Sequence, residues 1–206
     1  MLITFEGIDG SGKSTQMGIL SEKLKGLGRD FITTREPGAT EIGLQIRHIL
    51  LDPRNKAMCS TAELLLYMAD RIQHVEEQIA PAVKAGELVL CDRYHDATLA
   101  YQGGGRGLDL SWIKPLEEKL IEPARTYFIR ISPEQSRERL NQRNLAQGAE
   151  DCRLEQEDLD FFRAVDLGYM ELAKANAQRF CVIDGMGEVE AIARQIWDDL
   201  APRLEG

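Results

Sequence analysis

The sequence predicts a three-layer α/β fold in which a five-stranded parallel sheet is flanked by helices. Two observations lead to this prediction. Short apolar runs recur along the chain with helical patterns between them, an alternation typical of parallel sheets. A glycine-rich, phosphate-binding type of sequence directly follows the first apolar run. The five predicted strands are Leu2–Phe5, Phe31–Thr33, Leu88–Cys91, Tyr127–Ile131 and Phe180–Ile183.

The glycine-rich stretch at residues 5–15 carries the first functional signal. It matches G-x-x-x-x-G-K-[ST], and the residues at its fixed positions are Gly7, Gly12, Lys13 and Ser14. Glycines let the backbone approach a ligand, and the N–H groups of the loop and of the next helix then point at one concavity suited to an anion. The lysine adds positive charge, and the serine hydroxyl can bind Mg²⁺. A glycine-rich turn that binds nothing is the alternative, but the flanking strand and helix favour a nucleoside triphosphate site with Mg²⁺.

Length, charge and composition are those of an ordinary globular chain. The 206 residues suit one domain, with no linker or internal repeat. The net charge of −9 argues against nucleic acid as a partner, because phosphate backbones bind basic surfaces. No stretch approaches the roughly 18 apolar residues that would span a membrane, and no signal peptide is expected because the chain begins with a predicted strand. The cysteines show no paired spacing, which suits a reducing cytoplasm.

Helical patterns fill the segments between the strands. The predicted helices are Ser14–Leu27, Glu41–Leu51, a long helix over 60–85, a short helix at Ser111–Leu120, one that begins at Ser132–Pro133, a long one from near Glu155, and Glu188–Leu200. The 60–85 helix is apolar over most of its first half, so it covers the sheet or meets a second copy of the chain. Tyr67 and Arg71 share a face of this helix. Their spacing alone favours a core tyrosine beside a surface arginine.

Residues that follow the strands are candidate ligands, because parallel α/β sheets bind ligands beyond the carboxyl ends of their strands. Arg35 follows the second strand, where a solvated arginine and a ligand are about equally expected. Asp92 and Arg93 follow the third strand. In phosphate-transfer enzymes of this architecture, a carboxylate at that place can bind Mg²⁺, and a guanidinium can bind a phosphate.

Two polar segments are predicted to be mobile. Ala100–Gly107 contains three successive glycines, and it either presents Tyr101 and Gln102 to a ligand or is a loose surface loop. The helix from Ser132 loosens into a hairpin that predicts a small lid at about 141–153. Arginines there could fold over ATP and neutralise charge on the transferred phosphoryl group, although a solvated arginine face is the alternative. Arg143 and Arg153 lie within the predicted lid, and Arg137 and Arg139 lie on the helix just before it.

Five further stretches resemble the thymidylate kinase family. They are 34–40 (TREPGAT), 65–71 (LLYMADR), 92–94 (DRY), 100–107 (AYQGGGRG) and 153–162 (RLEQEDLDFF). Together with the glycine-rich stretch at residues 5–15, known as a P-loop, they cover nearly the whole chain. Many NTPases share the P-loop, and the combination of these stretches is far more specific. The resemblance implies a P-loop NTPase fold of the nucleoside monophosphate kinase type. It also implies that ATP, with Mg²⁺, phosphorylates dTMP to dTDP in dTTP synthesis.

The resemblance further implies a role for each matching residue. Lys13, Arg93, Arg153 and Asp9 are expected to be catalytic, and Ser14 and Asp92 to bind the metal. The expected ATP-binding residues are Gly7, Ile8, Asp9, Gly10, Ser11, Gly12, Lys13, Ser14, Thr15, Arg143 and Arg153. The expected dTMP-binding residues are Asp9, Arg35, Pro37, Tyr67, Arg71, Arg93, Thr98, Tyr101 and Gln102. Among them, Tyr67 stacks on thymine, Arg71 binds its carbonyl edge, and Tyr101 leaves little room for a 2′-hydroxyl.

The chain departs from the family pattern at two informative positions. Gly10 stands where one branch of the family has a P-loop arginine. The bacterial branch supplies that charge from the lid, and Arg153 is expected to do so here, with Arg143 or Arg139 as the alternative. Ala97 stands where many members have serine, which puts one polar contact to the acceptor in question, while Thr98 remains.

Rival functions make different demands on the sequence. Another nucleoside or nucleotide kinase of the same fold, acting on a purine or cytosine, would need a residue other than Arg71 to bind the edge of its base. A P-loop regulatory switch for guanine nucleotides would carry N-K-x-D, and the nearest string, at 55–58, lacks the aspartate. A purely structural protein would have no reason to keep arginines and glycines at the strand ends. The expected partners are therefore dTMP and ATP, with no nucleic acid and no membrane, and a second copy that forms a homodimer through the 60–85 helix.

Overall fold

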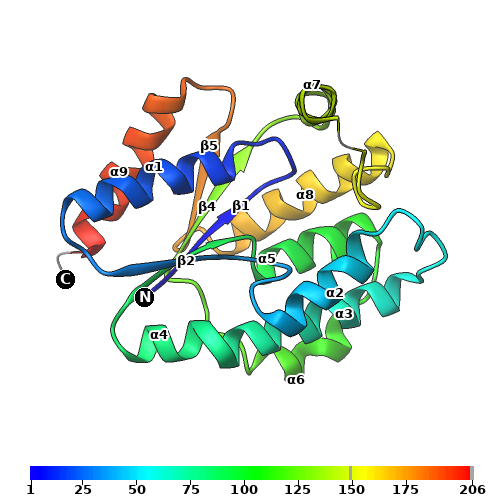
Figure 1. Ribbon diagram of the computed structural model, residues 1–206, viewed down its shortest axis with the longest axis horizontal. Helices are drawn as coiled ribbons and strands as arrows, with labels where there is room; N and C mark the ends of the chain where they lie inside the picture. Colours follow the sequence, from blue (N-terminus) through cyan, green and yellow to red (C-terminus); the bar gives the residue numbers. More distant parts are fainter. Residues whose placement is uncertain (149, 205–206) are drawn as a thin grey trace.

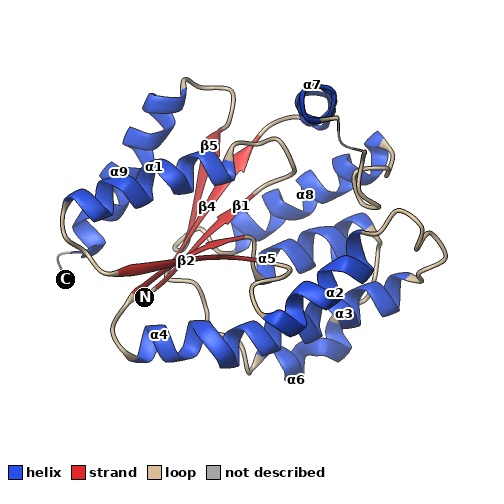
Figure 2. Cartoon of the chain, viewed as in Figure 1, coloured by secondary structure: helices blue, strands red, loops and turns tan. Residues whose placement is uncertain are grey.

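Five parallel strands form one sheet, in the order β2-β3-β1-β4-β5 (Figures 1 and 2). The computed structural model describes residues 1–148 and 150–204, so position 149 of the predicted lid and the last two residues lie outside the described chain. The strands are β1 (Leu2–Glu6), β2 (Phe31–Arg35), β3 (Leu88–Asp92), β4 (Arg125–Arg130) and β5 (Phe180–Asp184). All five predicted strands are confirmed, and their ends differ by about two residues or fewer.

Helices fill the connections between these strands. They are α1 (Lys13–Gly26), α2 (Glu41–Leu51), α3 (Ser60–His74), the π-helix η1 (Val75–Ile79), α4 (Ala80–Lys84), α5 (His95–Thr98), the π-helix η2 (Leu99–Gly105), the 3₁₀-helix η3 (Ser111–Ile113), α6 (Lys114–Glu117), α7 (Pro133–Gln147), α8 (Leu159–Ala175) and α9 (Val189–Leu204). The predicted helix over 60–85 is confirmed as the continuous run of α3, η1 and α4. None of the described helices is long and apolar enough to cross a membrane.

Two helical layers cover the sheet (Figure 1). On one face, Leu24 of α1 and Ile196 of α9 pack with Phe5 of β1. On the other face, the core contains Phe128 of β4 and Tyr169 of α8, whose rings stack with centroids 4.8 Å apart. The alternation of apolar strands and helices thus produces the three-layer architecture that the sequence predicts.

The register brings three strand ends to one edge of the sheet. Phe5 of β1 and Arg35 of β2 both lie opposite Asp92 of β3. Two hydrogen bonds continue this pairing beyond the strands, from Arg93 N to Phe5 O and from Glu36 N to Asp92 O, each 2.9 Å long. Because parallel strands end at the same edge, the P-loop and the residues after β2 and β3 become neighbours.

The prediction of a flexible loop at Ala100–Gly107 is wrong. Most of this stretch belongs to η2, which packs along α8. A Cβ atom on Gly104 would lie 3.0 Å from the carbonyl oxygen of Ala164, and one on Gly105 would lie 2.6 Å from Cε2 of Phe161. The glycines therefore permit close packing of two helices, and they do not loosen the chain.

The lid region is more helical than predicted. Ser132 caps α7 through a capping box with Gln135, as the Ser-Pro signal indicates. The helix then continues through the first half of the predicted lid and ends at Gly148, which has a φ of 60°. Asp158 caps α8 by accepting a hydrogen bond from a backbone N–H, so the long helix begins later than predicted. The lid arginines accordingly stand on α7 or in the short segment between the two helices.

Candidate active site

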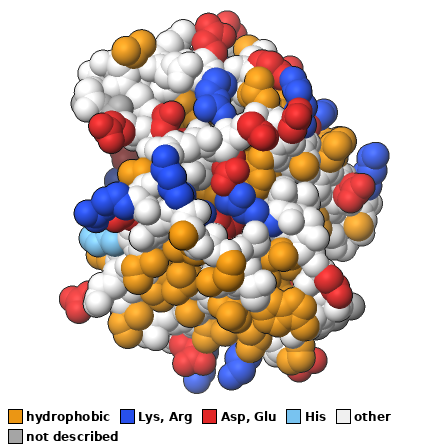
Figure 3. Space-filling model, turned by 90° about the vertical axis from the view of Figure 1, so that its right-hand side faces the viewer, with side chains coloured by type: hydrophobic (Ala, Val, Ile, Leu, Met, Phe, Trp, Pro, Cys, Tyr) orange, Lys and Arg blue, Asp and Glu red, His pale blue; other side chains and the backbone are white. Residues whose placement is uncertain are grey.

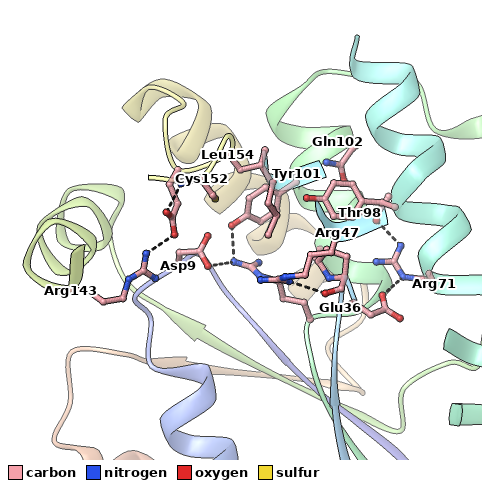
Figure 4. A pocket seen from close by; sticks show the side chains of 16 residues that line it. Asp9, Glu36, Arg47, Arg71, Thr98, Tyr101, Gln102, Arg143, Cys152 and Leu154 are labelled. Carbon is pink, nitrogen blue, oxygen red and sulfur yellow. Dashed lines mark hydrogen bonds and ion pairs between the residues drawn. The ribbon is translucent and has the colours of Figure 1, made fainter. Parts of the chain in front are cut away.

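Two adjoining cavities lie at the carboxyl edge of the sheet. The first, the P-loop cavity, is lined by Asp9, Gly10, Gly12, Lys13, Ser14, Thr15, Arg35, Glu36, Arg47, Asp92, Arg93 and Arg143. The second, the aromatic cavity, has a volume of about 180 Å³ (Figure 4). It is lined by Asp9, Glu36, Pro37, Arg47, Leu51, Tyr67, Arg71, Arg93, Ala97, Thr98, Tyr101, Gln102, Arg143, Cys152, Leu154 and Glu155. Five residues line both cavities, so the cavities meet at Asp9, Glu36, Arg47, Arg93 and Arg143.

The P-loop encloses one side of the first cavity. Its glycines at 7, 10 and 12 have φ values of 135°, 77° and 98°, which residues with a Cβ atom rarely adopt. Lys13 folds onto its own loop, where Nζ donates to the carbonyl oxygens of Gly7 (2.9 Å) and Ile8 (3.1 Å). The charge of Lys13, the loop amides and the start of α1 make this cavity suitable for a polyphosphate.

A hydroxyl and a carboxylate come together in the P-loop cavity. Ser14 Oγ donates a hydrogen bond of 2.7 Å to Asp92 Oδ2. Hard oxygen ligands of this kind suit Mg²⁺, which takes one or two protein ligands and completes its shell with phosphates and water. The residues present therefore fit the metal that the sequence predicts.

Arg93 stands at the junction of the two cavities. Its φ of 66° lies in the left-handed region, which is uncommon for a residue with a side chain. Its Nη2 donates to Asp9 Oδ1 (3.0 Å) and to Tyr101 Oη (3.1 Å). Burial alone would raise the pKa of Asp9, but Arg93 and Lys13 lower it to about 2, so this carboxylate stays ionised. The junction thus holds a fixed guanidinium in a partly buried place, where charge acts strongly on a bound anion.

Arg71 forms the polar end of the aromatic cavity, opposite the end that holds Asp9 and Arg143 (Figure 4). Its side chain is buried, and it donates to Glu36 Oε2 (2.7 Å), to Thr98 Oγ1 (2.6 Å) and to a backbone carbonyl. Buried tyrosine rings also line this cavity. A cavity with aromatic walls and a few placed polar groups suits a flat, polar-edged ring such as a nucleobase.

The two lid arginines occupy different places. Arg143 lines both cavities and donates from Nη2 to Glu155 Oε1 (2.8 Å). Arg153 is not among the residues that line either cavity. Its Nη2 lies 2.7 Å from Glu63 Oε2, and its Nε donates to the carbonyl oxygen of Leu50 at 2.7 Å. The structure therefore does not bring Arg153 to the P-loop cavity as the sequence led us to expect, and it brings Arg143 there.

The structure brings most of the other predicted residues to the cavities. Gly7, Ile8 and Ser11 shape the loop behind the P-loop cavity without lining it. Arg35 lines the P-loop cavity and not the aromatic one, although we expected it at the acceptor phosphate. The remaining predicted acceptor residues line the aromatic cavity, namely Asp9, Pro37, Tyr67, Arg71, Arg93, Thr98, Tyr101 and Gln102.

Sequence reasoning missed Arg47, which lines both cavities. It lies on α2, and its Nη1 donates to the carbonyl oxygen of Pro37 at 2.8 Å. A Cβ atom on Gly38 would lie 2.7 Å from Cδ of Arg47, so the glycine of TREPGAT makes room for this arginine. The available signal was its position off the apolar face of the predicted helix. Sequence reasoning also missed Glu36, which is buried and accepts hydrogen bonds from Arg71 and His74.

Cys152 also lines the aromatic cavity. Burial raises the pKa of its thiol to about 11. Because the thiolate is the reactive form, this cysteine is a weak nucleophile near neutral pH.

Comparison with known proteins identifies the family to which this chain belongs. The thymidylate kinase family model matches residues 5–196. The chain belongs to the thymidylate kinase family. It is 46% identical to a thymidylate kinase of Geobacter sp. (strain M21), over 98% of this chain and 92% of that relative. It is 48% identical to one of Pelobacter propionicus, over 94% of this chain and 90% of the relative.

A solved structure agrees with this membership. The crystal structure of thymidylate kinase from Ehrlichia chaffeensis superposes with a TM-score of 0.78 at 31% identity, and the match covers 97% of this chain and 98% of that chain. The resemblance and the P-loop NTPase fold predicted from the sequence are both confirmed. Family membership also means that ATP is the expected phosphate donor.

Proposed function

We propose that the chain transfers the γ-phosphoryl group of ATP to the phosphate of dTMP and produces dTDP for dTTP synthesis. One observation carries this proposal: the P-loop cavity opens directly into the aromatic cavity, and Arg93 stands where they meet. A triphosphate in the first cavity and a nucleoside monophosphate in the second would therefore bring their phosphates together. The thymidylate kinases among its relatives support thymine as the acceptor base.

The donor side consists of the P-loop and the start of α1. Loop amides and Lys13 bind the phosphates of ATP. To reach the phosphates, Lys13 Nζ gives up its hydrogen bonds to the carbonyl oxygens of Gly7 and Ile8. Ser14 and Asp92 would hold Mg²⁺, which neutralises phosphate charge when bound. Arg143 approaches the same phosphates from α7. It supplies the charge of the P-loop arginine that one branch of the family has at the position of Gly10.

The acceptor side consists of the aromatic cavity. Tyr67 stacks on the thymine ring, and Arg71 donates to its carbonyl edge from the polar end of the cavity. Tyr101, held by its hydrogen bond with Arg93, lies against the deoxyribose. Arg47 and Arg93 face the acceptor phosphate, because they line the wall that the two cavities share. Discrimination of thymine from uracil depends on one methyl group, which is worth about 1–3 kcal/mol, so it is expected to be moderate.

The reaction needs positioning and charge compensation and no covalent intermediate. Two anionic phosphates must approach each other, and Lys13, Arg93 and Arg143 offset their repulsion. An acceptor phosphate oxygen is already anionic near neutral pH, so no side chain has to act as a general base. Asp9, ionised and bonded to Arg93, keeps that guanidinium in place. Cys152 of the lid and Leu154, which directly follows the lid, line the aromatic cavity and limit access of water.

An acceptor panel tests this function. ADP release is measured with ATP and Mg²⁺ against dTMP, dUMP, dCMP, dGMP, AMP and thymidine. We expect fast turnover with dTMP, weaker turnover with dUMP and negligible turnover with the others. Turnover with thymidine would instead indicate nucleoside phosphorylation. Nucleotide binding without any acceptor-dependent turnover would indicate a regulatory switch.

An apolar surface supports the homodimer. Ile42 and Ile49 of α2, Leu65 of α3 and Trp112 of η3 have exposed fractions of 52%, 47%, 46% and 47%. Figure 3 shows hydrophobic side chains gathered over the lower half of the face that holds α2, α3 and α6. Apolar patches of this kind on a folded chain mark protein interfaces. We propose that a second copy covers this face through the 60–85 helix, together with α2.

A single charge should disrupt this dimer. We expect Leu65→Glu to shift the protein from two copies to one in mass photometry at micromolar concentration, because the carboxylate would be buried without a partner. The matched control is Leu145→Glu, which changes a leucine with an exposed fraction of 84% on α7, a helix at the top of Figure 1 while α2 and α3 lie in its lower half. A wild-type monomer, or equal dissociation of both variants, would contradict the interface.

We also propose that the protein is located in the cytoplasm. The four cysteines are free thiols, which suits the reducing cytoplasm predicted from their spacing. ATP and deoxynucleotides are also available in that compartment.

A further inference from the structure

Glu63 is a buried carboxylate next to the aromatic cavity. It belongs to α3 and has an exposed fraction of 1%, yet it is not among the residues that line the cavity. One of its partners, Gln102 of η2, does line the cavity and is equally buried. Glu63 can therefore act on a bound ligand only through a neighbour, which makes it a candidate positioning residue.

Three hydrogen bonds and one ion pair involve the two oxygens of this carboxylate. Oε1 accepts hydrogen bonds from Gln102 Nε2 (2.8 Å) and Arg106 Nε (3.2 Å). Oε2 accepts from Arg106 Nη2 (3.0 Å) and lies 2.7 Å from Arg153 Nη2. Burial would raise the pKa of Glu63, but the hydrogen bonds from Arg106 and Gln102 lower it overall. The carboxylate is therefore ionised near neutral pH, and both of its oxygens accept hydrogen bonds.

An ionised carboxylate can only accept hydrogen bonds, so it dictates which end of the Gln102 amide faces it. The amide nitrogen must point to Glu63, and the amide oxygen must point the other way. Because Gln102 lines the aromatic cavity, this oxygen is the polar atom that it offers there. Gln102 lies with Thr98 and Arg71 at the polar end of the cavity (Figure 4). That end thus combines the donors of Arg71 with one fixed acceptor.

We propose that Glu63 is a positioning residue that sets base specificity by holding the Gln102 amide so that its carbonyl oxygen faces the aromatic cavity. This inference rests on the proposed function. Thymine and uracil carry an N3–H group that can donate to the oxygen. Cytosine has an unprotonated N3 at the same place, which would face the oxygen as acceptor against acceptor. A site that pairs a buried polar group with one substrate rejects the analogue that leaves it unpaired.

Arg153 and Arg106 hold this carboxylate from two sides. Arg153 comes from the lid region, and its backbone N–H donates to the carbonyl oxygen of Leu51 at 3.0 Å. Arg106 follows η2, lies over the ring of Phe161 and pairs with Glu157 at 2.7 Å. The lid region therefore contacts Glu63 through Arg153, and it lines the two cavities through Arg143.

The test is the ratio of kcat/KM for dTMP to kcat/KM for dCMP. We expect Glu63→Gln to lower this ratio at least about 10-fold, because a glutamine at 63 lets the Gln102 amide turn. The KM for ATP should stay within about 2-fold, since the P-loop is untouched. The matched control is Glu157→Gln, which removes a carboxylate from Arg106 without contact to Gln102, and its ratio should equal that of the wild type. An unchanged ratio in Glu63→Gln, or an equal loss in Glu157→Gln, overturns the proposal.

An exchange of the two side chains adds a rescue. In the double variant Glu63→Gln with Gln102→Glu, the amide nitrogen at 63 can donate to the carboxylate at 102, whose other oxygen again faces the cavity as an acceptor. We expect the ratio to return to within about 3-fold of the wild type. A ratio that stays at the value of the single variant overturns the orientation argument.

A measurement on the wild type covers the case in which Glu63→Gln does not fold. The side-chain amide protons of Gln102, assigned by comparison with Gln102→Glu in ¹⁵N spectra, should exchange much more slowly than those of the exposed Gln45. Exchange at the rate of Gln45 overturns the proposal. Absence of wild-type turnover with dTMP would refute the proposed function instead, and the exchange measurement would still decide the amide orientation.

Discussion

Arg93→Ala should lower kcat for dTMP phosphorylation by at least about 10³-fold, because a transition-state guanidinium is worth that much in phosphoryl transfer. Arg93 lines both cavities, and it is bonded to Asp9 and Tyr101 at their junction. No other residue found at the junction is held between an ionised carboxylate and a tyrosine hydroxyl in this way. Steady-state rates from the ADP-release assay measure the loss.

The fold should survive this substitution. The side chain of Arg93 reaches the cavity edge, and its removal costs a few hydrogen bonds, so the free energy of unfolding should fall by about 1–2 kcal/mol. Arg93→Lys keeps the charge but loses the planar fork, and we expect an intermediate rate. Arg54→Ala is the control, because that arginine side chain has an exposed fraction of 88% and pairs with Asp52 at the surface. Near-normal turnover in Arg93→Ala would refute its place between the two phosphates.

Arg143→Gln should lower kcat about 10²-fold, whereas Arg153→Gln should change it less than about 5-fold. The two arginines stand ten positions apart in the sequence, but only Arg143 lines the cavities. Arg153 is an ion-pair partner of Glu63. Its loss should appear instead as a fall of about 2 kcal/mol in the free energy of unfolding, because Glu63 keeps Arg106 but loses a buried ion-pair partner, and the carbonyl oxygen of Leu50 loses a hydrogen bond. Parallel kinetics and denaturant unfolding separate the two effects.

The matched control for this pair is Arg163→Gln. That arginine lies on α8, has a side-chain exposed fraction of 53% and pairs with Glu134 away from the cavities. It should retain the rate and nearly all the stability of the wild type. A 10²-fold loss in Arg153→Gln combined with a normal rate in Arg143→Gln would restore the role that the sequence suggested for Arg153.

Local patterns in the sequence predicted the parts of this protein that depend on neighbouring residues. Alternating apolar runs predicted the five strands because burial on both faces of a parallel sheet demands continuous apolar segments. The glycines and the lysine of residues 7–13 predicted the phosphate site because its backbone angles and charge come from consecutive residues. The Ser132–Pro133 signal predicted the start of α7 for the same reason. TREPGAT, DRY and AYQGGGRG then indicated the family, and with it the acceptor.

Only the tertiary structure decided the roles that depend on segments far apart in the chain. The choice between Arg143 and Arg153 follows from a contact across 103 positions, between Arg153 and Leu50. The orientation of Gln102 follows from Glu63, 39 positions away. The glycines of η2 led to the wrong prediction of a flexible loop. The helix that they pack against, α8, lies about 60 residues later in the chain, where a local pattern does not extend. The role of a side chain depends on the residues that the fold places in contact with it. A local sequence pattern does not contain those residues when they lie far away in the chain.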